Sequence, residues 1–348
     1  MLSPAGMGDR SGNAGQWTRR GFLGATAAGL WTLAAPAAAA DKTNQLSGHS
    51  GLIKKVVSID QGRRGTTITL ALDNGMFPAP GSRYQDATTI VFVPNHFRVL
   101  DDQRVDAVVH FHGHRTTAAD SMVKHQLREQ LDDSRQNAIL VMPQGPVRRS
   151  DSSGGNLDKP GGFQKFLGEV RTALQSAKAA EALGPSRVPS AARIGMVCVS
   201  AHSGGFGVTA RCIKHGGFDI GEVYLFDALY GEVAAYADWV GERRDQSGRE
   251  RHKLVCYYTG GKVRSNSLTL MRELKRQGID ALHEQREGQL TRSQITKARA
   301  VFIRARDHMR VTYKSNALRD CLYASSLKRR LDSDWFANKD DERAIEPR

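Results

Sequence analysis

Ser203 stands where a nucleophile could be held. The stretch VCVSAHSGGFGV (197–208) passes from an apolar run through His-Ser-Gly-Gly to Phe206. A strand that ends at a serine and continues as a helix makes a sharp turn, which lifts the hydroxyl out of the sheet. That turn needs small residues two positions before and after the serine, and Ala201 and Gly205 occupy them. The pattern predicts a nucleophile, or else a tight turn without chemistry.

Two later strand ends carry the partners that a serine nucleophile needs. A base must take the serine proton, and a carboxylate must orient that base. Asp227 follows the apolar run EVYLF, and His308 follows the last apolar run, AVFIRAR. We predict His308 as the general base and Asp227 as the orienting acid. Asp307 is the competing acid, although adjacent side chains usually point apart.

The order of apolar and polar segments predicts how these residues are held. Three short β-rich runs come first, at 52–59, 66–72 and 88–94. After them, strands that are apolar throughout alternate with helix-like segments, a pattern typical of a parallel sheet covered on both faces. Strands are expected at 105–113, 137–145, 193–201, 222–231, 253–261 and 300–308, and helices at 118–134, 163–183, 268–278 and 314–331. This order of segments predicts a doubly wound α/β sheet.

With these residues in this order, the chain resembles the α/β-hydrolase superfamily over about residues 50–330. One feature departs from the usual pattern. Most members place the acid after the following strand, which here ends Tyr-Tyr-Thr-Gly-Gly (257–261) and has no carboxylate. Asp227 matches the alternative position seen in some lipases. The resemblance implies the α/β-hydrolase fold and acyl-enzyme chemistry at Ser203.

The resemblance also implies an oxyanion hole, in which N–H groups stabilise the charge of the tetrahedral intermediate. One donor is the backbone of Gly204, the residue after the nucleophile. The second comes from the turn in HFHGHR (110–115), which matches the His-Gly element of the superfamily. His114 is the first candidate there, and Gly113 is the alternative.

The same turn admits a different site. His110, His112 and His114 alternate, so an extended strand would put all three on one face, as a zinc site requires. Only Asp120 and His125 follow as further ligands. We therefore expect no metal and no cofactor. His202 is expected to be a packed or hydrogen-bonded residue of the turn.

Substrate choice is the least defined property. The predicted chemistry fits esters, thioesters and amides, and carboxylic ester hydrolysis is the first expectation by resemblance. Tyr230 and Trp239 are candidate substrate-binding residues, and core packing is the alternative for such aromatic residues. Amidase or peptidase activity on cell-envelope material is the second hypothesis. A non-catalytic binding protein of the same fold is the third.

Residues 1–40 have the composition of a removable export signal. Arg19 and Arg20 precede a moderately apolar Ala- and Gly-rich segment that ends in small residues before Asp41. This arrangement resembles a twin-arginine (Tat) signal, and an uncleaved membrane anchor is the alternative. We expect export by the Tat machinery to the periplasm or beyond, and a single α/β-hydrolase domain over 41–348.

Charge and cysteine content set two further expectations. The net charge of +14 favours contact with an anionic surface. The basic residues are scattered among acids with no aromatic interleaving, so specific nucleic-acid binding is not expected. Cys198, Cys212, Cys256 and Cys321 have no metal-ligand spacing and are expected as buried thiols, with a Cys198–Cys256 disulfide as the alternative. The expected partner is a small-molecule or envelope-derived acyl substrate.

Overall fold

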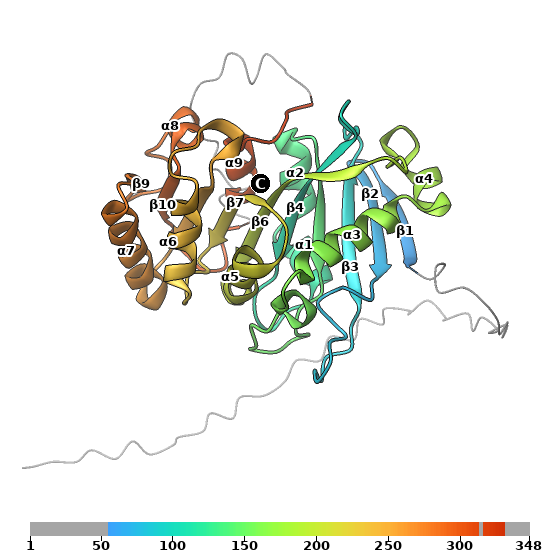
Figure 1. The fold of residues 1–348 in the computed structure, drawn as a ribbon, viewed down its shortest axis with the longest axis horizontal. Helices are drawn as coiled ribbons and strands as arrows, with labels where there is room; N and C mark the ends of the chain where they lie inside the picture. The colour runs from blue at the N-terminus through green and yellow to red at the C-terminus, as the bar shows by residue number, and fades with distance from the viewer. Residues whose placement is uncertain (1–54, 313–315, 331–348) are drawn as a thin grey trace, which may run out of the picture. The chain divides into compact units, whose positions relative to one another are not determined.

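A ten-stranded sheet is the frame of this chain in a computed structural model, which describes residues 55–312 and 316–330. The strand order is β1-β2-β3-β5-β4-β6-β7-β8-β10-β9. Figure 1 shows the sheet running from the blue β1 at one edge to β9 at the other. The strands are β1 Val56–Gly62, β2 Gly65–Ala71, β3 Thr88–Pro94, β4 Arg104–Phe111, β5 Ala138–Pro143, β6 Arg193–His202, β7 Ile220–Phe226, β8 Lys253–Tyr258, β9 Ala281–Glu284 and β10 Ala300–Arg304. The predicted leader, residues 1–40, lies outside the described residues.

Strand direction follows the composition of the segments. The pairs β1–β2, β2–β3 and β3–β5 are antiparallel, and the pairs from β5 through β4, β6, β7, β8 and β10 to β9 are parallel. β5, β7 and β8 are buried along their whole length, as expected for strands that are apolar throughout and covered on both faces. The sheet is mostly parallel and belongs to the α/β class, as the sequence predicted.

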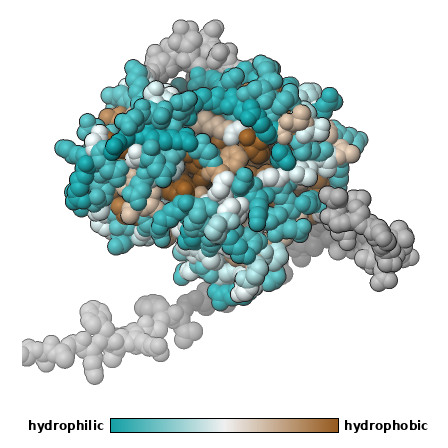
Figure 2. Space-filling view, in the orientation of Figure 1, coloured by the Kyte–Doolittle hydropathy of each residue, from teal (hydrophilic) through white to brown (hydrophobic). Residues whose placement is uncertain are grey.

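Helices cover both faces of the sheet and make two hydrophobic cores. α3, α4, α5, α6 and α7 contribute to the larger core, and α1, α2, α8 and α9 contribute to the smaller one. The helices are α1 Ala118–Lys124, α2 Leu127–Ser134, α3 Gly162–Leu174, α4 Ala177–Leu183, α5 Phe206–His215, α6 Val233–Glu242, α7 Gly261–Arg276, α8 Arg292–Lys297 and α9 Ala317–Tyr323. On the face drawn in Figure 2, hydrophilic residues cover most of the surface and hydrophobic ones show through at its centre.

Several boundaries differ from the sequence predictions. The helix expected at 118–134 is two helices, because Gln126 between them has a left-handed backbone with φ 50°. The segment 163–183 is likewise divided, since Ser176 caps a new helix. α7 begins at Gly261, seven residues before the predicted 268. β9 was missed because its sequence, ALHE, has no apolar run.

The register of the parallel strands brings their carboxyl ends to one edge of the sheet. This edge is formed by the ends of the strands, not by the outer strands β1 and β9. His202 at the end of β6 pairs with Phe226 at the end of β7, which pairs with Tyr257 of β8. Phe111 at the end of β4 pairs with Ala201. The residues that follow these strands therefore meet at this edge, where α/β sheets bind their ligands.

Two observations bear on the cysteines and on the membrane. All four cysteines are buried free thiols, so the expectation of thiols is confirmed and the Cys198–Cys256 disulfide does not form. Among the described helices, none has the length and apolarity to cross a bilayer.

Candidate active site

Ser203 lies on the turn between β6 and α5, where a short 3-10 segment, Ser203–Gly205, joins strand to helix. Its backbone is left-handed, with φ 50°. A residue with a Cβ in this region carries about 1–2 kcal/mol of strain, so the surrounding structure must hold it there. Asp227, directly after β7, has the same property with φ 46°. Two of the three predicted catalytic residues thus sit on strained strand ends.

The small residues around Ser203 are required by close approach to the neighbouring strand. A Cβ added to Gly205 would lie 2.7 Å from the Phe111 carbonyl oxygen and 3.2 Å from Ala201 Cβ. Ala201 is itself fully buried. The steric rule that selected these two positions therefore has a physical basis in the packing of β4 against the turn.

Gly205→Ala is expected to lower the free energy of unfolding by about 1–3 kcal/mol, because β4 or the turn must move to admit the methyl group. Urea unfolding measures this. Gly168→Ala is the matched control, since nothing lies within 4 Å of a Cβ at that helical position. It should raise the free energy of unfolding by about 0.5–1 kcal/mol. Equal stability of the two variants would contradict the crowding of the turn.

Asp227 and His308 form a close polar pair at the site. His308 Nδ1 lies 2.5 Å from Asp227 Oδ2. Asp227 is 1% exposed, and Thr259 donates to it from its backbone N–H (2.8 Å) and its hydroxyl (2.9 Å). Asp307 instead accepts two backbone N–H groups of its own turn, from Met309 and Arg310. The carboxylate on the His308 imidazole is therefore Asp227.

Tyr230 connects the serine and the histidine. Its hydroxyl lies near the Ser203 side chain, whose interaction opposes the rise of the tyrosine pKa. Its ring stands edge-on to His308, with 6.5 Å between the ring centroids. Burial, with the nearby charge of Asp227, raises the pKa of Tyr230, so the hydroxyl stays protonated. Ser203, Tyr230 and His308 thus face one another at the edge of the sheet.

The two predicted oxyanion donors lie beside Ser203. A Cβ on Gly113 would fall 3.1 Å from Ser203 Cβ. A Cβ on Gly204 would fall 2.1 Å from His114 Cδ2, so the His114 ring covers the backbone of Gly204. His114 Nε2 is 2.8 Å from Ser152 Oγ in the loop 147–162. The structure therefore brings the turn after β4, the serine turn and this loop together.

The loop 147–162 is tied down at the site rather than left as a free connector. Arg211 pairs with Asp158 and donates to the Ser152 carbonyl at 2.6 Å. His215 Nε2 donates to the Asp158 carbonyl at 2.8 Å. A cavity of about 10 Å³ lies between this loop, Gly113 and Gly204. That volume is enough for about one water molecule.

The zinc alternative is not supported by the side chains. His110 Nδ1 bonds to Ser200 Oγ at 2.8 Å. His112 Nδ1 faces the Gly113 carbonyl at 2.7 Å, and its Nε2 accepts the Gly145 N–H. Burial lowers the pKa of each of these histidines. Within residues 55–312 and 316–330, no cluster of three or more metal-binding side chains occurs.

Two imidazoles, those of His202 and His125, lie in a row behind the ring of His308. The rings of His125 and His202 are 4.8 Å apart, and those of His202 and His308 are 4.9 Å apart. His202 Nε2 donates to the His308 carbonyl oxygen at 3.0 Å. The prediction of a hydrogen-bonded His202 is thus confirmed, and its contact fixes the backbone that carries His308. Burial and the nearby His125 lower the pKa of His202 to about 3, and burial lowers that of His125 to about 4.

These buried histidines predict acid sensitivity. The folded-state pKa of His202 lies below its unfolded value of about 6.5, so the unfolded chain binds the proton first as the pH falls. Stability present above pH 6.5 is lost towards pH 3. At pH 5, His202 alone should remove about 2 kcal/mol from the free energy of unfolding. Urea unfolding of the wild type and His202→Gln at pH 7.5 and pH 5 tests this, and an equal loss in both proteins would contradict it.

Trp239 is not brought to this edge of the sheet. It is 3% exposed on α6 and stacks on His252, with 4.4 Å between ring centroids. His252 immediately precedes β8, at the opposite edge from Ser203. Trp239 therefore packs in the core, which was the alternative for this residue.

Sequence reasoning missed Thr259 and considered His125 only as a metal ligand. Thr259 directly follows β8. The sequence signal that could have found it is a hydroxyl residue at the end of the strand that lies beside β7. His125 lies between α1 and α2, inside a segment expected to be one continuous helix. No signal in the sequence linked it to His202.

Comparison with known proteins gives similarities of fold at low identity. No protein-family model and no curated protein matches the chain. Acetyl xylan esterase from Aspergillus awamori is 12% identical with a TM-score of 0.45, covering 75% of this chain and 100% of that one. S-formylglutathione hydrolase from Agrobacterium tumefaciens is 11% identical with a TM-score of 0.43, covering 79% and 100%. The feruloyl esterase module from Clostridium thermocellum is 14% identical with a TM-score of 0.43, covering 78% and 95%. The chemistry must therefore be inferred from the side chains of this chain.

Proposed function

We propose that the protein is a serine hydrolase that cleaves carboxylic esters with Ser203, His308 and Asp227. The observation that carries the proposal is the 2.5 Å contact between Asp227 Oδ2 and His308 Nδ1 beside a strained serine at a strand end. With Nδ1–H directed at the carboxylate, Nε2 of His308 is the free base that a serine nucleophile requires.

The reaction proceeds in two steps, acylation of Ser203 and hydrolysis of the acyl-enzyme. Ser203 Oγ attacks the ester carbonyl carbon while His308 Nε2 takes the hydroxyl proton. The carbonyl oxygen becomes an oxyanion, which the N–H of Gly204 and that of His114 or Gly113 stabilise. The C–O bond to the alcohol then breaks as His308 returns the proton to the leaving oxygen. In the second step His308 Nε2 takes a proton from water, whose oxygen attacks the acyl carbon. The bond from that carbon to Ser203 Oγ then breaks as His308 returns the proton to Oγ, which releases the acid and free Ser203.

The surroundings of Ser203 suit a substrate with an apolar portion. Tyr230 and Met309 are each 38% exposed, although most large apolar residues of the described chain are buried. Both flank His308, Tyr230 by ring contact and Met309 as the next residue. They offer an apolar surface at the mouth of the site on which an acyl or alcohol group can pack. Tyr230 is therefore kept as a substrate-binding residue.

Amide hydrolysis on cell-envelope material is the second candidate, supported by the leader-like residues 1–40 and the net charge of +14. We propose export of the folded chain through the Tat machinery for the same reason. Changing Arg19 and Arg20 together to lysine should retain the full-length precursor in the cytoplasm, measured by fractionation. Unchanged export of the double variant would contradict the twin-arginine assignment.

Labelling with a fluorophosphonate probe tests the serine chemistry, and peptide mass spectrometry should place the adduct on Ser203. Hydrolysis of p-nitrophenyl esters of increasing chain length, compared with aminoacyl anilides, separates esterase from amidase. Activity that is chelator-sensitive without labelling would overturn the proposal in favour of a metal enzyme. Neither activity nor labelling would indicate a binding protein of this fold.

A further inference from the structure

A basic pocket of about 710 Å³ lies at the edge of the sheet opposite the active site. β3 runs antiparallel to β5 and pairs Phe92 with Leu140, so the residues after β3 lie beyond the start of β5. The parallel strands begin there and end near Ser203. Strands of six or more residues separate the two edges by on the order of 20 Å. This pocket is therefore distinct from the proposed catalytic site.

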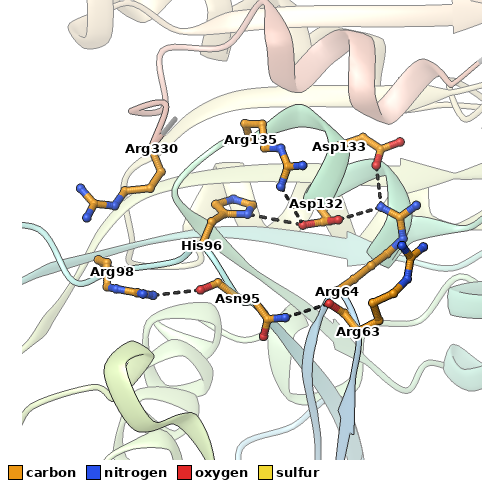
Figure 3. A pocket seen from close by; sticks show the side chains of 9 residues that line it. All are labelled: Arg63, Arg64, Asn95, His96, Arg98, Asp132, Asp133, Arg135 and Arg330. Carbon is orange, nitrogen blue, oxygen red and sulfur yellow. Dashed lines mark hydrogen bonds and ion pairs between the residues drawn. The ribbon is translucent and has the colours of Figure 1, made fainter. Parts of the chain in front are cut away.

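Arginines from four separate segments line the basic pocket (Figure 3). The segments are the β1–β2 turn, the stretch after β3, the end of α2 and the stretch after α9. The arginines are Arg63, Arg64, Arg98, Arg135 and Arg330. Every other residue of the lining is polar or charged as well: Asn95, His96, Asp132 and Asp133. Among the described residues, no aliphatic side chain and no Phe, Tyr or Trp lines this pocket, so they offer an apolar ligand little to pack against.

The two carboxylates of the basic pocket are already paired. The Nη1 atom of Arg64 lies 2.7 Å from Asp132 Oδ2 and 2.6 Å from Asp133 Oδ1. Arg135 Nη1 and His96 Nδ1 each lie 3.4 Å from Asp132 Oδ1. Burial opposes ionisation of Asp132, but these bonds from His96 and Arg64 outweigh it and lower its pKa. Both carboxylates are thus engaged with the wall of the pocket.

Three positive charges are left without a carboxylate among the described residues. Arg98 Nη1 donates to the carbonyls of Asn95 and Phe97 and to Ser186 Oγ, all uncharged acceptors, at 2.5–3.0 Å. Arg63 and Arg330, which also line the pocket, form no ion pair with any described carboxylate. Figure 3 shows Arg98 and Arg330 on one side of the pocket and Arg63 on the other. Five arginines against two aspartates leave a net charge of +3, with His96 counted as neutral.

We propose that the basic pocket binds a small hydrophilic ligand that carries two phosphoryl groups. A phosphoryl group bears about −1.5 to −2 charges at neutral pH, so two of them match the net charge of the pocket. Guanidinium groups donate paired N–H bonds to phosphate oxygens. Cations on two sides of a wide pocket fit a ligand with two anionic groups better than a ligand with one. Three contacts hold Arg98 in place, so this part of the site is formed before the ligand arrives.

Isothermal titration of the full chain with inorganic diphosphate, orthophosphate and citrate tests the proposal. Diphosphate should bind more tightly than the other two. The double variant Arg63→Gln with Arg330→Gln should bind diphosphate at least about tenfold more weakly, because each lost charge-assisted bond is worth that factor or more. Both side chains lack ion pairs in the described structure, so the melting temperature and fluorophosphonate labelling should not change.

A control variant separates specific binding from the general attraction of a basic protein. Lys178 and Arg286 are exposed and lie outside the basic pocket. Changing both to glutamine removes the same two charges and should leave diphosphate affinity within about twofold. Equal losses in the two double variants would overturn the proposal, as would tighter binding of citrate. Failure of the ester assay would not bear on it, because labelling and titration report different sites.

Discussion

Ser203→Ala is expected to reduce ester turnover by about four to six orders of magnitude and to abolish fluorophosphonate labelling. The hydroxyl oxygen is the atom that forms the acyl bond, so the covalent route is lost with it. Stopped-flow or long-incubation assays with p-nitrophenyl acetate measure the residual rate. The remaining hydrolysis should reflect the oxyanion donors and substrate binding alone.

The same variant should fold normally. The left-handed backbone at residue 203 has about the same steric cost for alanine as for serine, since both carry a Cβ. The melting temperature should therefore stay close to that of the wild type, which makes the loss of activity attributable to the hydroxyl. Turnover within tenfold of wild type, with intact folding, would move the nucleophile elsewhere.

The serine turn and the strand ends were predictable because they obey short-range rules. Ala201 and Gly205 mark the turn through steric limits that a sequence shows directly. Asp227 and His308 lie 81 residues apart but follow two apolar strands. Parallel strands end at a common edge, so the strand pattern was enough to bring these two residues together.

The parts that escaped prediction depend on packing rather than on strand order. Thr259 matters only because β7 and β8 are neighbours in register, which places its hydroxyl on Asp227. His125 reaches His202 because the backbone of Gln126 ends one helix and begins another. Trp239 faces the core because of its position around α6, and the aromatic spacing alone did not fix that direction.

The basic pocket shows the same limit for charge. Its arginines come from segments up to 267 positions apart, from Arg63 to Arg330. Along the chain they are interleaved with acids and were interpreted as scattered surface charge. The fold gathers five of these arginines around a pocket whose described lining contains two carboxylates. Net charge predicted an attraction to anions, whereas the location required the tertiary structure.

Asp227→Asn is expected to lower turnover by about 10⁴-fold while preserving the fold. Asparagine tolerates the left-handed backbone at φ 46°, so the turn after β7 should remain. The backbone N–H of Thr259 donates to Asp227 Oδ1, which requires an oxygen at that position in the variant. The amide NH₂ must then face His308 Nδ1 and donate to it. The imidazole proton is thereby forced onto Nε2, where it blocks transfer of the proton from Ser203.

Two further variants make this mechanism specific. Asp307→Asn should retain near-normal turnover, because the hydrogen bonds that the Asp307 carboxylate accepts from described residues come from backbone N–H groups of its own turn. Thr259→Val keeps the backbone donor but removes the hydroxyl bonds to Asp227, and a loss of about tenfold is expected for one such charge-assisted bond. Steady-state kinetics at pH 8 compare the three. Only the carboxylate that orients His308 Nδ1 should be sensitive to the exchange of an oxygen for NH₂. A large loss of turnover in Asp307→Asn, together with near-normal turnover in Asp227→Asn, would therefore assign the acid role to Asp307.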